Sequence, residues 1–363
     1  MHTPHGRNEA DMKNFMIYGS YGYTGRLILE QAIKEGMHPI LAGRNKVQLS
    51  AQANGLGLEY HAFDLNDASA LNTALGKVDA VLHCAGPFSL TYNTMVEACL
   101  ANKKHYVDIS GEIEEFEALA KMDVRAREAG VMLLPGGGFD VVPSDCLALY
   151  LSKRLPNATK LELNIMSVGS GVSRGTARSG IENMHRQGRI RRDGKVVSVP
   201  NAWRIKQVDF GRGPKRLVSV GWGDVSTAFY TTKIPNIEVY MAFPRAAIQA
   251  MYITRILGPL LYSRPAKNFL KWLVGKLLPP GPSRERNQNG FSLLIGEVTD
   301  GSKTAAAKLR TPEPYYLTAL TSVEIMKHIL ESNYKSGFQT PARAYGEDFI
   351  LQYPGVSREN LER

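Results

Sequence analysis

Short apolar runs alternate with longer segments of helical spacing through the first 134 residues, and this alternation restricts the fold more than any other feature. Apolar runs of strand length lie at residues 14–18, 39–42, 59–63, 78–84, 106–109 and 131–134. Segments with helical spacing lie at residues 24–35, 92–102 and 112–129. Strands that alternate with helices predict a parallel sheet covered on both faces, which is an α/β domain of the Rossmann type.

A glycine-rich turn joins the first predicted strand to the first predicted helix, with the spacing G-x-x-G-x-x-G. Glycine lets the backbone approach a pyrophosphate closely, and N–H groups at the helix start meet its charge. A glycine triplet alone often marks only a turn, but the flanking strand and helix favour phosphate binding. The predicted dinucleotide contacts here are Gly19, Ser20, Tyr21, Gly22, Tyr23, Thr24 and Gly25.

The residue after the second predicted strand indicates which dinucleotide binds. NAD-binding domains usually carry an acidic residue there, about 20 residues beyond the glycines, for the ribose 2′-hydroxyl. This chain has Arg44, nineteen positions after Gly25, followed by Asn45. A guanidinium can hold a 2′-phosphate with two hydrogen bonds, whereas a carboxylate repels it. Arg44 and Asn45 therefore predict NADP as the cofactor, with a solvated surface arginine as the alternative.

Two further groups follow strands at the same edge of the sheet, where ligands bind in such folds. Asp64 comes after the third strand and is placed for the adenine end of the cofactor, although a turn carboxylate explains it nearly as well. Ala85, Gly86 and Pro87 follow the fourth strand. Small residues at this position admit the nicotinamide ribose, and a tight turn is the alternative.

Hydride transfer to a carbonyl, an imine or an activated alkene also needs a proton donor. Asp108 and Ser110, just beyond the fifth strand, are the best-placed catalytic candidates. Ser110 and Glu112 alternatively have only the spacing of helix-start residues. His83 is predicted to be a satisfied strand histidine rather than a base. The three glycines at 136–138 indicate either a backbone close to a ligand or an interdomain hinge.

The strand–helix rhythm ends near residue 135. Strand-like runs then mix with longer helical stretches, which predicts an α+β second domain; the runs are 161–168, 217–220, 237–243 and 291–298. Arg174, Thr176 and Ser179 open a helical stretch that either faces the substrate or is shaped by capping turns. Residues 315–330 have the spacing of an amphipathic helix. Residues 1–13 are polar and are predicted to be a disordered tail.

The formal net charge of +10 favours acidic ligands, such as cofactor phosphates, lipid headgroups or nucleic acid. The basic residues gather in one cluster, consisting of Arg186, Arg189, Arg191, Arg192, Lys195, Lys206, Arg212, Lys215 and Arg216. No zinc-finger, helix-turn-helix or aromatic stacking motif accompanies the cluster, so we do not expect a nucleic-acid partner. Three scattered cysteines predict neither a disulfide framework nor a metal site. Apolar runs are too short for a membrane span, and the expected location is the cytoplasm.

Residues 246–278 form an apolar segment with basic residues, interrupted at residues 258–259. Its second part predicts an apolar helical face with Ala266, Phe269, Leu270, Leu273 and Leu277, opposite a face with Lys267 and Lys271. Such a helix suits peripheral contact with an anionic membrane surface. A lid over a lipid-sized pocket with its lysines outside, or an ordinary core helix, explains it equally. Residues 279–282 end the helix, and residues 283–290 predict a mobile polar loop.

Several segments together resemble the saccharopine dehydrogenase-like oxidoreductases, and in particular the bacterial trans-acting enoyl reductase-like proteins. They are residues 19–26 (GSYGYTGR), 42–45 (AGRN), 84–89 (CAGPFS), 105–112 (HYVDISGE), 135–146 (PGGGFDVVPSDC) and 173–179 (SRGTARS). The resemblance implies a dinucleotide domain over 14–134 and a substrate and dimerisation domain over 135–312. It also implies a carboxyl-terminal segment, 313–363, whose helix returns to the first domain. It names no substrate.

Together these features predict an NADP-dependent oxidoreductase that reduces an enoyl or keto group of a hydrophobic, lipid-like substrate. A regulatory protein that senses NADPH without turnover is the alternative, because no complete acid–base pair is evident. A third hypothesis is a basic protein that binds nucleic acid through residues 186–216, with strongly salt-dependent affinity.

The glycine turn generates the first prediction. Gly22→Val should abolish NADPH binding, because a side chain at this position obstructs the approach of the backbone to the pyrophosphate. Titration of the folded variant, monitored by cofactor fluorescence, checks this. Normal NADPH affinity in Gly22→Val would mean that the turn does not bind the cofactor.

Overall fold

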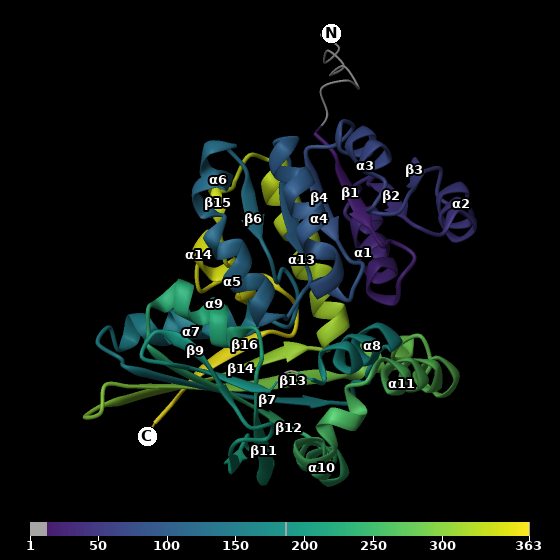
Figure 1. Cartoon of the computed structure of the whole chain (residues 1–363). Helices are drawn as coiled ribbons and strands as arrows, with labels where there is room; N and C mark the ends of the chain where they lie inside the picture. Colours follow the sequence, from purple (N-terminus) through teal and green to yellow (C-terminus); the bar gives the residue numbers. More distant parts are fainter. Residues whose placement is uncertain (1–12, 186, 363) are drawn as a thin grey trace.

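The computed structural model describes residues 13–185 and 187–362. The predicted tail lies outside these residues except for Lys13, as does Arg186 of the basic cluster. A first domain with one sheet lies above a second domain built on a larger sheet, and the polypeptide enters both more than once (Figure 1).

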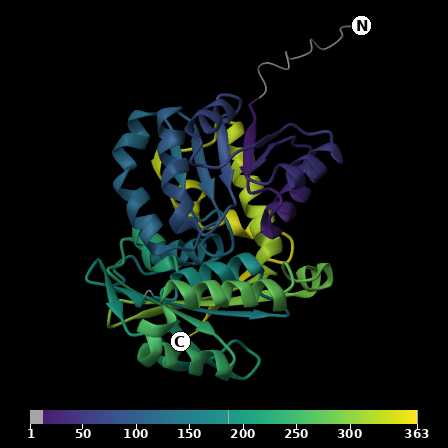
Figure 2. The same cartoon turned by 45° about the vertical axis from the view of Figure 1, so that its right-hand side comes forward.

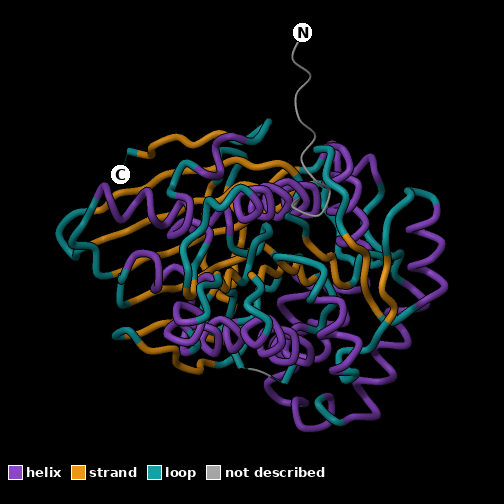
Figure 3. Tube along the Cα trace, turned by 90° about the horizontal axis from the view of Figure 1, so that it is seen from above, coloured by secondary structure: helices purple, strands orange, loops and turns teal. Residues whose placement is uncertain are grey.

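The first sheet has seven strands in the order β15-β6-β5-β4-β1-β2-β3, and all its pairs are parallel. Its strands are β1 (Phe15–Tyr18), β2 (Ile40–Gly43), β3 (Tyr60–Ala62), β4 (Ala80–His83), β5 (His105–Asp108), β6 (Met132–Leu134) and β15 (Gly337–Phe338). Apolar side chains on both faces of a strand require cover on both sides of the sheet. Viewed from above, helices flank the strands on either side (Figure 3). The predicted Rossmann-type sheet is confirmed.

The helices of the first half are α1 (Tyr23–Lys34), α2 (Lys46–Asn54), α3 (Ala68–Leu75), α4 (Phe88–Ala101), α5 (Ile113–Lys121) and α6 (Asp123–Glu128). The single helical stretch predicted at 112–129 is divided into two helices at Met122. Side-chain caps fix two of the starts. Asn45 accepts the N–H of Gln48 at the start of α2, and Asp67 accepts that of Ala70 at the start of α3.

The second sheet is mixed, with the order β10-β11-β12-β7-β13-β14-β16 and β8 and β9 attached beside β12. Its strands are β7 (Lys160–Val168), β8 (Gly188–Arg192), β9 (Lys195–Val199), β10 (Ile205–Asp209), β11 (Pro214–Val220), β12 (Asn236–Ala242), β13 (Phe291–Thr299), β14 (Thr304–Pro312) and β16 (Ser357–Leu361). The central strand β7 runs parallel to β12 and antiparallel to β13. The predicted α+β second domain is confirmed.

The helices of the second half are α7 (Val142–Arg154), α8 (Arg174–Asn183), α9 (Asp224–Thr232), α10 (Arg245–Leu261), α11 (Arg264–Leu277), α12 (Arg284–Asn289), α13 (Pro314–Leu330), α14 (Pro341–Tyr345) and the 3-10 turn η2 (Phe349–Gln352). One apolar core runs from the first sheet through α7 and α13 to the second sheet, and includes Ile28, Leu147, Leu294 and Leu320. Across the described ranges, we find no helix with the length and apolarity that crossing a membrane requires.

The carboxyl-terminal segment divides between the two domains. Helix α13 packs against α1 and the strands β4 and β5, and β15 adds a parallel strand beside β6. The last strand does not return to the first domain, because β16 pairs antiparallel with β14. The segment 313–363 therefore links the two sheets.

Two predicted interruptions in the second half are wrong. Helix α10 continues through residues 258–259, where a proline close to the helix end removes only one hydrogen bond. The predicted mobile loop at 283–290 contains α12, because the Ser283 hydroxyl accepts the N–H of Arg286 and starts a helix.

A buried arginine joins the two domains. Arg191 of β8 is 3% exposed, and its guanidinium donates to Glu117 of α5 and lies 4.2 Å from the ring centroid of Phe229. The Glu117 carboxylate also accepts the hydroxyls of Ser226 and Tyr230, at 2.7 and 3.0 Å. Of the basic cluster, Arg189 and Lys206 likewise face carboxylates, Glu114 and Glu162, so part of its charge is neutralised within the protein.

Glu117→Ala should destabilise the fold by about 3 kcal/mol, because it leaves the Arg191 guanidinium buried without its anion. Urea unfolding measures the change. Glu97→Ala is the matched control, since Glu97 pairs with Arg125 on the surface and its loss should cost less than about 1 kcal/mol. Equal stability changes in the two variants would contradict a structural role for the interdomain pair.

Candidate functional site

The glycine turn lies between β1 and α1 in a strained, close-packed conformation. Gly19 has a φ of +91° and donates its N–H to Ala42, at 2.7 Å. A Cβ on Gly25 would lie 2.4 Å from the carbonyl oxygen of Gly19, and one on Gly22 would lie 3.2 Å from it. Gly22 caps α1 in an extended conformation without a side-chain hydrogen bond. The first N–H groups of α1 therefore have no capping side chain, as an anion site requires.

The side chains of the turn bind neighbouring segments instead of projecting freely. Ser20 is fully buried, and its hydroxyl donates to Gln52 at 2.8 Å. The Tyr21 hydroxyl accepts the N–H groups of Arg44 and Asn45, at 3.3 and 3.4 Å. The Tyr23 hydroxyl donates to the carbonyl of Pro282 at 2.8 Å, and Thr24 is half-buried on α1. Phosphate contacts from this turn consequently fall to its backbone.

Arg44 and Asp64 lie together at the ends of β2 and β3. Their side chains approach to 3.8 Å and are 73% and 46% exposed. Such exposure leaves the guanidinium accessible to a phosphate, although Asp64 competes for it. The Asn45 side chain is occupied in capping α2. Arg44 and Asp64, both predicted to contact the cofactor, therefore lie side by side, whereas the Asn45 side chain caps a helix.

The loop after β4 faces the second domain. Gly86 is exposed, and a Cβ on it would lie 3.4 Å from the Ser179 hydroxyl of α8. Beneath the loop, His83 is fully buried against the Thr91 hydroxyl, which donates to the carbonyl of Ala85 at 2.9 Å. Burial lowers the pKa of His83 to about 3, so the ring is neutral and supports the loop. Figure 2 shows α8 lying between the two domains, above the second sheet.

Of the three polar residues predicted at the start of α8, only Ser179 lies against the loop that follows β4. Thr176 bonds with the Tyr315 hydroxyl at 2.9 Å, and Arg174 donates to the carbonyl of Leu278. Ser173, which sequence reasoning did not single out, caps the helix.

Neither predicted catalytic residue is open to a substrate. Asp108 is 0% exposed, and one of its carboxylate oxygens accepts the N–H groups of Ser110 and Gly136, at 2.9 and 2.8 Å. Ser110 is 1% exposed, and its hydroxyl accepts the N–H of Glu112. The helix-start interpretation of Ser110 thus accounts for its contacts. Both side chains hold loops in place beneath the site surface.

The three glycines at 136–138 are explained by packing. The Gly137 N–H donates to the carbonyl of Asp108 at 2.7 Å, and a Cβ on Gly138 would lie 2.7 Å from Thr318 of α13. The Thr321 hydroxyl donates to the carbonyl of Gly137 at 2.8 Å. Helix α13 therefore presses this loop against β5, and the glycines allow the close approach.

Asp140 is the acidic residue that sequence reasoning passed over. It follows the glycine loop, is half-buried, and its Oδ2 would lie 3.0 Å from a Cβ on Gly111. The Trp222 indole donates to its backbone carbonyl at 2.9 Å. Burial raises the pKa of Asp140 to about 6. Asp140 follows β6, at the same sheet edge as the loop after β5, and this position could have indicated a site residue from the sequence.

A cavity of about 360 Å³ begins at this edge and extends between the domains. Its lining comes from the start of α5, from α8, β8 and β11, and from α10. Apolar lining residues include Ile113, Met184, Val220 and Met251, and polar ones include Glu112, Asn183, Arg189 and Thr254. A buried side-chain oxygen of Asn183 has no hydrogen-bond partner in the described part of the chain. The cavity joins the loop after β5 to the wall formed by α10.

Residues 15–134 match the family model of the saccharopine dehydrogenase NADP binding domain. The match is confined to the first domain, which is similar to the dinucleotide-binding domain of that family. The saccharopine dehydrogenase-like oxidoreductase of Rattus norvegicus is 28% identical over 211 residues, which are 51% of this chain and 48% of that protein. A putative trans-acting enoyl reductase of Mycobacterium tuberculosis is 28% identical over 182 residues, or 47% of this chain and 43% of that protein.

The saccharopine dehydrogenase-like fold extends beyond the matched domain. The apo saccharopine dehydrogenase (L-Glu forming) of Saccharomyces cerevisiae superposes with a TM-score of 0.65, at 13% identity, over 96% of this chain and 100% of that chain. At this identity the likeness concerns the fold alone. The chain spans about half the length of the curated relatives it matches. The match of the first domain supports a nicotinamide dinucleotide cofactor.

Arg44→Asp should weaken NADPH binding by about 1.5–3 kcal/mol, roughly 10- to 150-fold, because it removes a charge-assisted phosphate contact. NADH affinity should change far less, since NADH has no 2′-phosphate. Isothermal titration with both cofactors checks this. Lys34→Asp, at the far end of α1, repeats the charge change away from the site. Equal affinities of the wild type for the two cofactors would refute the assignment of Arg44.

Proposed function

We propose that the chain is an NADP(H)-dependent reductase of an enoyl or keto group on an apolar substrate that occupies the 360 Å³ cavity. The observation that carries the proposal is the position of the cavity. It begins at Gly111 and Glu112, on the same sheet edge as the glycine turn and the exposed Arg44. Substrates of open parallel sheets bind at this edge, where a nicotinamide reaches them.

Each part of the NADP(H) cofactor has a candidate binding segment in the first domain. The glycine turn offers backbone N–H groups to the pyrophosphate, Arg44 meets the 2′-phosphate, and the loop at 85–87 borders the nicotinamide ribose. Bound NADPH would supply a hydride. Met184, Val220 and Met251 give the cavity an apolar wall, which suits a hydrocarbon chain.

Asp140 is the proposed proton donor. Reduction of a double bond by hydride leaves a carbanion or an alkoxide, and one proton completes the two-electron reduction. A carboxyl with a pKa near 6 can give up that proton and recover it from water. Asp108 and Ser110 position the loop beside Asp140 and need no contact with the substrate. The putative trans-acting enoyl reductase among the relatives supports an enoyl substrate.

A panel of enoyl and keto acyl compounds of increasing chain length tests the function. NADPH consumption should rise with chain length, and deuterium from 4-deuterated NADPH should appear in the product. NADPH binding without turnover across the panel would overturn the reductase proposal and favour a sensor of the cofactor.

Asp140→Asn should lower kcat at least about 100-fold with an unchanged NADPH affinity, because an amide cannot supply the proton. In the wild type, kcat should fall as pH rises above about 6, where the acid loses its proton. Steady-state kinetics across pH check both. Asp193→Asn, in the exposed β8–β9 turn with a φ of 49°, is the matched control. Full activity of Asp140→Asn would assign the proton to another donor.

A further inference from the structure

The charges of the second domain are segregated along the chain. Residues 239–284 contain no aspartate or glutamate, although 34 acidic residues are spread over the 363 of the whole chain. The same stretch contains the basic residues Arg245, Arg255, Arg264, Lys267, Lys271, Lys276 and Arg284. It forms α10 and α11, which project from the second domain (Figure 1).

Helix α11 does not have the orientation of a lid or a core helix, which would place its lysines outside. Lys267 and Lys271 instead face α8 and pair with Glu182 there. The Lys267 side chain is only 13% exposed. These pairs lower the pKa of Glu182, so its charge is retained. The sequence pattern of α11 alone cannot reveal this ion pair, because Glu182 lies on another helix, α8, far away in the sequence.

The aromatic side of α11 faces solvent instead. Phe269, Trp272 and Leu277 are 59%, 57% and 72% exposed, and every residue of α11 is at least partly exposed. The rings of Phe269 and Trp272 are stacked, with their centroids 5.9 Å apart and an angle of 26° between the ring planes. At 100° per residue, Lys276 falls between Trp272 and Leu277 on this side. Exposed apolar side chains that gather on one side of a helix, here with two stacked aromatic rings, are typical of an interaction site.

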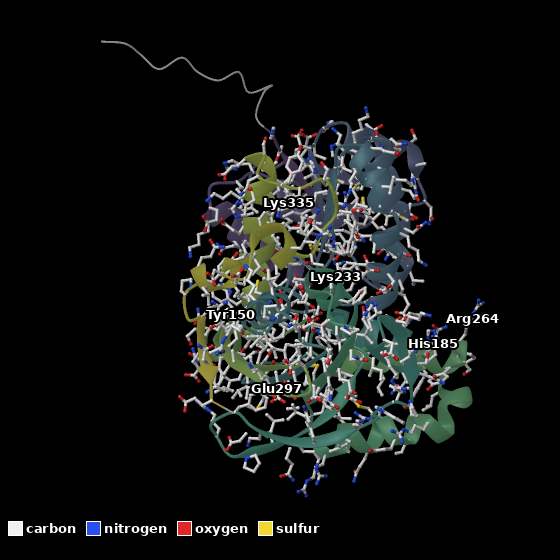
Figure 4. All side chains as sticks on the ribbon, turned by 90° about the vertical axis from the view of Figure 1, so that its left-hand side faces the viewer. Tyr150, His185, Lys233, Arg264, Glu297 and Lys335 are labelled. Atoms are coloured by element: carbon white, nitrogen blue, oxygen red, sulfur yellow. The ribbon has the colours of Figure 1, made fainter. Side chains whose placement is uncertain are left out.

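Helices α10 and α11 also carry exposed basic side chains. Arg264 and Lys276 of α11 are exposed, and so are Arg245 and Arg255 of α10. Arg264 points away from the body of the protein, beside His185 (Figure 4). Helix α10 adds exposed Tyr252 and Ile253, at 37% and 50%.

We propose that α10 and α11 dock on an anionic membrane surface, with Phe269, Trp272 and Leu277 at the level of the headgroups and acyl chains. Lys276 then lies among the lipid phosphates. Interfacial helices combine these features, an aromatic apolar face and basic residues. A second copy of the chain is a poorer occupant, because a two-fold contact through this surface brings like charges together.

Flotation with large unilamellar vesicles of phosphatidylcholine and phosphatidylglycerol, at 7:3, tests the surface. The wild type should float with these vesicles and not with pure phosphatidylcholine, and 0.5 M salt should reduce binding. Phe269→Ser/Trp272→Ser should bind at least about tenfold more weakly, since two apolar side chains no longer insert. Lys276→Glu should bind at least about fivefold more weakly.

Matched changes elsewhere separate the surface from general effects. Val124→Ser on α6 removes an apolar side chain that is 63% exposed, and Lys121→Glu reverses an exposed charge on α5. Both should bind vesicles like the wild type, and all variants should unfold at the same urea concentration. Wild type that fails to float, or binding that is equal in all variants, would overturn the proposal. So would a dimer in sedimentation that Phe269→Ser/Trp272→Ser converts to monomer. None of these readouts depends on catalysis.

Discussion

The carboxylate of Asp108 organises the working edge of the first sheet, since a single oxygen accepts an N–H group from each of two loops. One loop follows β5 and the other follows β6, so their relative positions depend on this one group. The result is that Asp140 lies against Gly111, which lines the cavity. A hydrogen bond to a buried charge is among the strongest that a loop can form. Burial raises the pKa of Asp108, and burial together with the neighbouring Asp108 raises the pKa of Glu115 well above its usual range.

The same loops are held from the opposite side by the end of the chain. Thr318 accepts the N–H of Phe139, and Thr321 donates to Gly137, so α13 completes a site whose other parts come from the first half. Helix α13 belongs to the core of both domains. With the Arg191–Glu117 pair at the other end of the interface, the two domains are joined by apolar packing and by a buried charge. The cavity between them is therefore bounded by firmly attached elements on the α5 side.

Local patterns predicted β1 to β6 of the first sheet, because most of these strands are short apolar runs. They did not predict α2, α3 or the last strand of this sheet, β15, which comes from residues 337–338. They missed β8 and β9, whose alternating arginines, lysines and valines carry little apolar signal, and α12, which is polar throughout and starts only because Ser283 caps it. The glycine turn and Arg44 could be singled out from the sequence because they directly follow predicted strands. Asp108 and Ser110 were placed at the correct edge, but burial decides between contact with a ligand and support of a loop. Burial depends on α13, which lies two hundred residues further along the chain.

Helix α10 contributes to the cavity lining on one side and to the protein surface on the other. The helix with its side chains is roughly 10 Å in diameter. Met251 and Thr254 line the cavity, while the two residues between them, Tyr252 and Ile253, are exposed. Neighbouring residues of this helix thus belong to the cavity lining and to the outer surface in turn. A shift of α10 against the second sheet would therefore change the shape of the cavity and the exposed surface together.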